Sequence, residues 1–135
     1  MINKLSKFII CAAAFTALLP TSSFANHVEC VISQYVEYPS GTQKCMTPNL
    51  AVPPKKFAIF KADVLQMSNY LILSGTVGVK NQVNGNILWT KNISDNAEYY
   101  FTPIKSKRHL RAYIKDAFGG RGVISISLKY ADYPF

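Results

Sequence analysis

The chemistry that this sequence can support is concentrated in a basic segment near its C-terminal end. Arg111, Tyr113 and Lys115 occur at every second position, so they would share the outward face of a β-strand. Residues 123–130 alternate in the same way, and a hairpin of the two strands would bring Lys129 onto that face. Ammonium and guanidinium groups placed together bind phosphate or carboxylate groups. We therefore predict a ligand-binding face made of Arg108, Arg111, Tyr113, Lys115 and Lys129. The alternative is a solvated sheet face whose charges oppose aggregation.

Residues suited to catalysis or to metal binding are sparse. His27 and His109 are the two side chains that could titrate near neutral pH without a large shift. The seven acidic residues are scattered along the chain, and the sequence contains no GxSxG, HExxH or CxxC motif. We therefore predict that the protein is not an enzyme, and that it needs no cofactor and no metal ion.

The first 25 residues have the three-part layout of a secretory signal peptide. Lys4 and Lys7 precede an apolar run from Phe8 to Leu19, and Ser23-Phe24-Ala25 supplies small residues for cleavage. The apolar run is too short to span a bilayer well, because a spanning helix needs about 20 apolar residues. We predict cleavage after Ala25 and export to the periplasm or the extracellular space, with no transmembrane anchor left after cleavage.

The charge of the chain points to an anionic partner. Its 15 basic and 7 acidic residues give a net charge of +8, and +6 remains once Lys4 and Lys7 are removed with the signal peptide. Such a balance favours an anionic glycan, a lipid headgroup or an acidic protein surface. Nucleic acid is an improbable partner for an exported protein. The alternative is that the charge only keeps the protein soluble.

Two cysteines remain after cleavage. Cys30 and Cys45 are 15 residues apart, and export would place them where thiols oxidise. They lack a CxxC motif or a nearby histidine pair, which is poor spacing for a metal site. We predict a disulfide between them.

The chain after the signal peptide predicts an all-β fold. Segment 39–56 is rich in Pro, Thr and Lys and predicts a connection or edge segment, and Pro103 predicts an edge strand. Asn84-Gly85 and the Gly-rich run 119–122 predict hairpin turns. Seven stretches alternate in a period of two and predict strands: 28–38, 57–66, 70–80, 86–93, 97–104, 109–116 and 123–130.

Short strands with turns at this spacing are typical of an antiparallel sandwich. The run Leu73-Ser74-Gly75-Thr76-Val77-Gly78-Val79-Lys80-Asn81, followed by Ile87-Leu88-Trp89, resembles the second and third strands of immunoglobulin-like modules of bacterial exported proteins. It resembles family-21 starch-binding modules more faintly. The first resemblance covers roughly residues 57–131 and implies a core position for Trp89 and a final hairpin from His109 to Tyr130. We expect an immunoglobulin-like sandwich of about seven strands with an N-terminal arm tied by the disulfide.

These features define one expected organisation and three expected functions. Residues 1–25 form the signal peptide, 26–56 the N-terminal strand with its Pro-rich connection, and 57–135 the sandwich body, the last two making a single domain, 26–135. The expected function is non-enzymatic recognition of an anionic partner at the cell envelope or outside the cell. A carbohydrate-binding module is the first alternative, and it would expose a row of aromatic side chains. An adhesin or assembly subunit that acts through an edge strand is the second.

Overall fold

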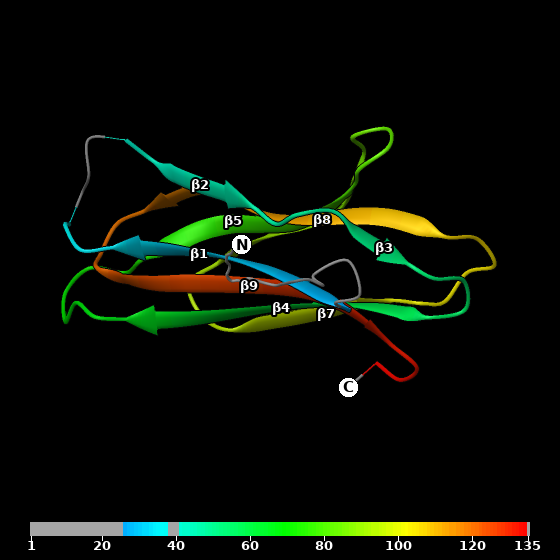
Figure 1. The fold of residues 1–135 in the computed structure, drawn as a ribbon. Helices are drawn as coiled ribbons and strands as arrows, with labels where there is room; N and C mark the ends of the chain where they lie inside the picture. Colours follow the sequence, from blue (N-terminus) through cyan, green and yellow to red (C-terminus); the bar gives the residue numbers. More distant parts are fainter. Residues whose placement is uncertain (1–25, 38–40, 135) are drawn as a thin grey trace, which may run out of the picture.

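The computed structural model describes residues 26–37 and 41–134, so the predicted signal peptide, 1–25, lies outside the described residues. The described residues form β-strands and no helix (Figure 1). Their bounds are β1 His27–Gln34, β2 Gln43–Met46, β3 Leu50–Val52, β4 Phe57–Gln66, β5 Ser74–Asn81, β6 Ile87–Ile93, β7 Ala97–Phe101, β8 Arg108–Phe118 and β9 Gly122–Ala131. The all-β prediction is confirmed. None of the described residues forms a helix that is long and apolar enough to cross a bilayer.

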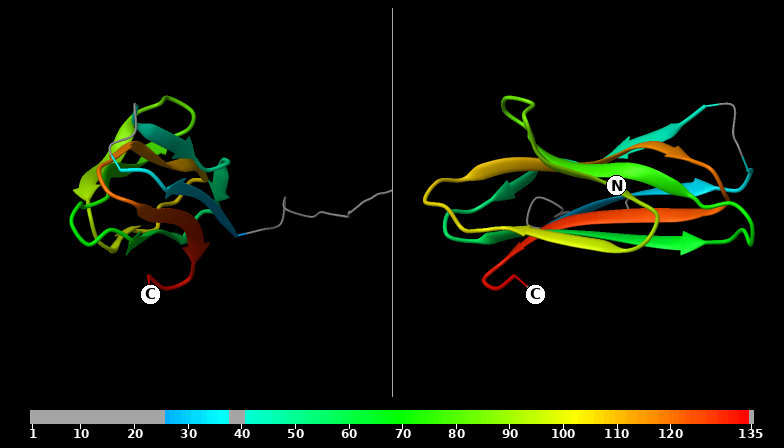
Figure 2. Two further views of the ribbon diagram at one scale, coloured as in Figure 1. Left: turned by 90° about the vertical axis from the view of Figure 1, so that its left-hand side faces the viewer. Right: turned by 180° about the vertical axis from the view of Figure 1, so that it is seen from behind.

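The strands build two antiparallel sheets that lie one over the other (Figures 1 and 2). Sheet I has the order β1-β9-β4-β7. Sheet II has the order β2-β8-β5-β6, and β3 also pairs with β8. The edge position predicted from Pro103 is confirmed, because β7, which ends two residues before it, is an edge strand of sheet I.

The pairing is nested along the sequence. The first strand pairs with the last, β2 and β3 pair with β8, β4 pairs with β7, and β5 pairs with β6. The chain is therefore one long antiparallel ribbon that is folded over on itself, with β4 against β9 in sheet I and β5 against β8 in sheet II. This is the arrangement of a jelly roll, a double-sheet fold with Greek-key connections.

The predicted hairpin between residues 109–116 and 123–130 is wrong. Strands β8 and β9 lie in different sheets, and the run Gly119–Gly122 carries the chain from one sheet to the other. A Cβ atom at Gly119 or Gly120 would overlap the carbonyl oxygen of Ile72 or Leu71, so this crossing requires glycine. The resemblance to immunoglobulin-like modules therefore extends to the two-layer antiparallel architecture and not to the order of the strands, because in those modules the last two strands share a sheet.

The expectation of a connection or edge segment at 39–56 is confirmed for its described part, because β2 and β3 lie within it, pair with β8, and β2 is an edge strand of sheet II. The expectation for the turn at 84–85 needs correction. The turn at Asn84-Gly85 is longer than the predicted two-residue turn, because the Asn81 N–H donates to the Asn86 carbonyl. Gly85 takes a φ of 76°, whereas Asn84 has a negative φ, so one residue of this loop carries the left-handed conformation.

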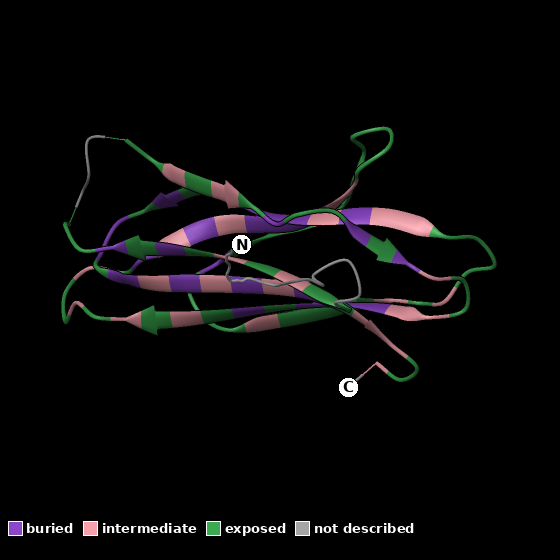
Figure 3. Cartoon of the chain, viewed as in Figure 1, coloured by how far each residue is buried: buried purple, intermediate pink, exposed green. Residues whose placement is uncertain are grey.

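The core lies between the sheets and is formed by the inward residues of both. Alternation is visible along β8 and β9 in Figure 3, where buried and more exposed positions succeed one another. Trp89 is partly buried and packs against the core next to Phe60, with ring centroids 5.1 Å apart. The predicted disulfide between Cys30 and Cys45 is confirmed, and it joins edge strand β1 of sheet I to edge strand β2 of sheet II.

Candidate functional site

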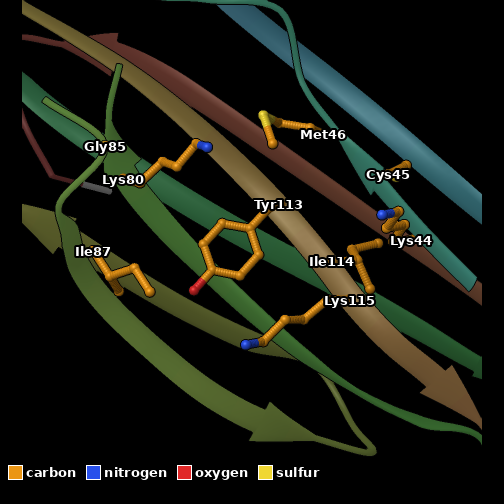
Figure 4. Close-up of a pocket in the computed structure, with 9 residues that line it drawn as sticks. All are labelled: Lys44, Cys45, Met46, Lys80, Gly85, Ile87, Tyr113, Ile114 and Lys115. Atoms are coloured by element: carbon orange, nitrogen blue, oxygen red, sulfur yellow. The ribbon is translucent and has the colours of Figure 1, made fainter. Parts of the chain in front are cut away.

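The outer face of sheet II carries a groove of about 510 Å³, which we call the Tyr113 groove. Strands β2, β5 and β8 supply most of its residues, and the loop before β6 supplies Gly85. Figure 4 shows the Tyr113 ring in the middle, between Lys80 and Lys115, with Met46 and Ile87 on either side. Its lining is Lys44, Cys45, Met46, Lys80, Gly85, Ile87, Tyr113, Ile114 and Lys115.

The register of the strands explains why these side chains meet. Tyr113 on β8 lies opposite Met46 on β2 and opposite Gly78 on β5. Neighbouring strands are about 4.8 Å apart, so these three residues form one row across the sheet. Arg111 lies two residues before Tyr113 and Lys115 two residues after it, so all three share one face of β8. Arg111 lies opposite Lys80.

Gly78 provides the space in which the Tyr113 ring lies. A Cβ atom at Gly78 would overlap the Tyr113 hydroxyl and would come within 2.6 Å of the Trp89 carbonyl oxygen. The missing side chain lets the ring lie across β5 toward β6 instead of standing out into solvent. Tyr113 is consequently only 7% exposed, although it occupies an outward position of its strand.

The Tyr113 hydroxyl has no hydrogen-bond partner among the described residues. A buried hydroxyl without a partner is unusual, because most buried polar side-chain atoms are hydrogen-bonded. The other two unsatisfied buried atoms are the Nε atoms of Arg108 and Arg111. Those two guanidinium groups make other contacts: Arg108 donates to the carbonyls of Thr102 and Lys56, and Arg111 contacts the Met46 sulfur at 3.4 Å. The Tyr113 oxygen is the sole polar atom of its side chain, so this side chain is entirely unsatisfied.

Three lysines surround the ring without compensating charge. Lys44, Lys80 and Lys115 make no ion pair within the described ranges, where the two ion pairs are His27–Glu29 and Lys56–Asp132. No acidic residue lines the Tyr113 groove. By contrast, two other hollows of the molecule both contain Lys61 together with Glu98. The groove therefore has a positive potential that its own residues do not neutralise.

A β-bulge follows directly after Lys115 at the rim of the groove. The register of β8 shifts against both β2 and β5 between Ile114 and Phe118, and Asp116 takes a φ of 57°. Asp116 is therefore exposed next to the exposed Lys115, whereas Ala117 returns to the core. Bulges are common beside functional sites, where they redirect a side chain.

The structure brings together three of the five predicted site residues. Arg111, Tyr113 and Lys115 lie on the outer face of sheet II. Lys129 does not join them, because β9 belongs to sheet I and Lys129 pairs there with His27 and Ile59. The single face predicted from the hairpin is thus wrong for Lys129.

Arg108 also lies apart from the Tyr113 groove. Its guanidinium donates to two loop carbonyls, those of Thr102 and Lys56, and so holds together the loops before β8 and before β4. Burial lowers the pKa of this guanidinium below its ordinary value. We interpret Arg108 as a structural residue.

Sequence reasoning missed Lys44, Lys80 and Gly78. Lys44 lies in the Pro-rich segment that was expected to be a connection, and Lys80 and Gly78 lie on a strand whose neighbours were unknown. A signal for Gly78 existed, since glycine inside a strand often marks a close approach of other atoms. The partner in that approach could not be named without the register.

The groove offers charged, polar and apolar groups to a ligand. Its lining supplies ammonium groups, one phenol and apolar side chains, and its cysteine is engaged in the disulfide. Within the described ranges, no group of three or more His, Cys, Asp or Glu side chains is placed to hold a metal ion.

Comparisons with known proteins give no family. No protein-family model and no curated protein matches the chain. Among solved structures, that of infectious bursal disease virus Gt strain is 10% identical, covers 78% of this chain and 36% of that chain, and has a TM-score of 0.32. That of the Gx strain is 12% identical, covers 80% and 33% of the two chains, and has a TM-score of 0.33. The chain thus spans about a third of the length of these structures. A likeness at this level is too weak to indicate a shared function.

Proposed function

We propose that this chain is a non-enzymatic, exported binding protein that recognises an anionic partner at the cell envelope or outside the cell, and that the Tyr113 groove is its binding site. The observation that carries the proposal is the set of three lysines, Lys44, Lys80 and Lys115, around a groove with no acidic residue. Like charges placed close together repel one another, and a bound anion relieves that repulsion.

The dimensions of the groove support the same proposal. Ligand sites in proteins commonly measure about 300–1,000 Å³ and combine apolar walls with a few polar groups. The Tyr113 groove, at about 510 Å³, has this composition. Export rests on the predicted signal peptide and on the disulfide, which forms in oxidising compartments.

Salt-dependent retention on anionic supports tests the proposal. Residues 26–135 are applied to heparin, to polygalacturonate and to phosphatidylglycerol vesicles at about 0.02 M and about 0.3 M salt, because screening weakens exposed charge pairs as salt rises. The variant Lys80→Glu/Lys115→Glu is expected to lose retention. The control Lys107→Glu/Lys129→Glu changes the net charge equally, but at exposed positions away from the groove.

The two variants separate a site from a general charge effect. Retention of the control with loss of the groove variant supports the groove. Equal loss in both variants would mean that net charge alone causes binding, and absence of wild-type retention on every support would refute the proposal. Far-UV circular dichroism confirms that each variant is folded.

A further inference from the structure

Resting on the proposed function, we infer that the group bound in the Tyr113 groove is a tetrahedral oxyanion ester, a phosphate or sulfate monoester on a small organic skeleton, and that the Tyr113 hydroxyl donates a hydrogen bond to it. Three independent observations lead to this inference: the unsatisfied hydroxyl, the type of cation around it and the apolar part of the lining.

The first observation is the state of the Tyr113 hydroxyl. It belongs to a side chain that is 93% buried and lines the groove, it lies against Gly78 of β5, and no described residue accepts from it or donates to it. Leaving a buried hydroxyl unpaired is costly, so such a group calls for a partner that the unliganded molecule lacks. A phenol hydroxyl donates well to an anionic oxygen, and hydrogen bonds to charged groups are among the strong ones.

The second observation is that the free cations are lysines. Lys44, Lys80 and Lys115 come from three different strands, β2, β5 and β8, and all three line the groove. None of these cations offers the planar guanidinium fork, which binds carboxylate and phosphate alike in a bidentate way, whereas the lysine ammonium is a point charge that commonly binds phosphate. Arg111, the nearest arginine on this face, already contacts the Met46 sulfur. Several ammonium groups and one hydroxyl along the same groove can serve the several oxygens of a tetrahedral anion.

The third observation concerns the carbon skeleton of the ligand. Met46 and Ile87 line the groove, and they are 42% and 56% exposed. Burial of such apolar side chains under the skeleton of an ester contributes to affinity, which inorganic phosphate alone could not exploit. The ligand is therefore an ester of a small molecule or of a repeating unit, about the size of a sugar.

Access to the hydroxyl requires a small movement. Its oxygen has under 1 Å² of exposed surface, so an anion must displace part of its surroundings to reach it. Lys115 is exposed, and both Lys115 and Lys80 lack an ion-pair partner among the described residues, so either long side chain is free to turn toward an anion. Binding then exchanges this cover for the ester oxygens.

Four probes with one sugar skeleton test the inference by isothermal titration: glucose 6-phosphate, glucose 6-sulfate, glucuronate and glucose. The proteins are the wild type, Tyr113→Phe and the control Tyr70→Phe, whose hydroxyl lies on a residue that is 90% exposed. We expect the phosphate and sulfate esters to bind the wild type at least about tenfold more tightly than glucuronate does. Loss of the hydroxyl should weaken ester binding about tenfold or more, since it removes a hydrogen bond to a charged group. Tyr70→Phe should bind like the wild type.

Thermal unfolding provides a readout that a purely structural role would not give. Removal of an unsatisfied buried hydroxyl should leave the melting temperature of Tyr113→Phe unchanged or raise it, while affinity falls. If Tyr113→Phe does not fold, the Tyr113 ring resonances of the wild type give the answer by NMR. They should shift with glucose 6-phosphate and not with glucose.

The outcomes distinguish this inference from the proposed function. Binding of glucuronate as tight as that of the esters, or full affinity in Tyr113→Phe, overturns the inference and leaves anion recognition intact. Failure of every anion, together with failure of the retention experiment above, overturns both. Vesicles of phosphatidic acid and of phosphatidylserine show which kind of molecule carries the monoester. If the protein prefers phosphatidic acid and does not bind the sugar esters, the monoester belongs to a lipid.

Discussion

The disulfide between β1 and β2 should supply a large part of the stability of this domain. It closes a loop of 15 residues, for which the loop-closure model gives about 3 kcal/mol at 25 °C. Unfolding entropy is about 2.1 cal/mol/K per residue, so a domain of the 110 residues that follow Ala25 should lose about 13 °C in melting temperature without the bridge. Cys30 and Cys45 also pack against the core, so substitution removes some packing in addition.

The measurement compares oxidised wild type, reduced wild type and Cys30→Ala/Cys45→Ala by thermal unfolding. The reduced protein should melt about 13 °C lower than the oxidised protein, the variant should melt lower still because it also loses packing, and reductant should not change the variant. A difference of less than about 4 °C between the melting temperatures of the oxidised and the reduced protein would refute the loop-closure argument. Labelling of two free thiols per oxidised chain would refute the bridge itself.

Two other predictions are independent of ligand binding. N-terminal sequencing of the protein from its native host should begin at Asn26, and an intact Met1 in mature protein would disprove cleavage after Ala25. Gly120→Ala should destabilise by about 1–3 kcal/mol or more in chemical denaturation, because its Cβ atom would overlap the Leu71 carbonyl, where backbone must move. Gly41→Ala is the matched control, since nothing lies within 4 Å of its added Cβ atom, and equal losses in the two variants would refute the steric argument.

Local patterns predicted the strands better than the way in which they pair. The expected strand 57–66 coincides with β4, and the alternation expected in 123–130 is present in β9, where Ile124, Ile126 and Leu128 are buried. Alternation assigns a residue to one face of its own strand, and this information is local. The Gly-rich run 119–122 is compatible with a hairpin and with a crossing between sheets, because glycine permits both. At the crossing, the carbonyl groups of Leu71 and Ile72 come so close that positions 119 and 120 must be glycine. These two residues belong to a loop about fifty residues earlier in the sequence.

The candidate site shows the same difference between what local patterns predict and what the pairing of strands decides. Arg111, Tyr113 and Lys115 were predicted together because they share one strand, and they do lie on one face. Lys129 was misplaced because its position depended on the assumed pairing of two strands. Lys44 and Lys80 could not be predicted, because they reach the groove from strands whose neighbours follow from the global topology. A residue's own strand could be identified from the sequence, whereas the residues across from it could not.

The nested pairing has a consequence for how the protein is made. A ribosome completes β1 first and β9 last, yet β9 is the strand with which β1 pairs, from His27 opposite Lys129 to Gln34 opposite Gly122. Sheet I therefore cannot close during synthesis, and β1 waits as an unpaired strand while the rest of the chain is added. Cys30 and Cys45 are the exception, because both exist after a few dozen residues have been made. A bridge formed once this segment reaches the oxidising compartment would hold β1 beside β2 until β9 pairs with β1.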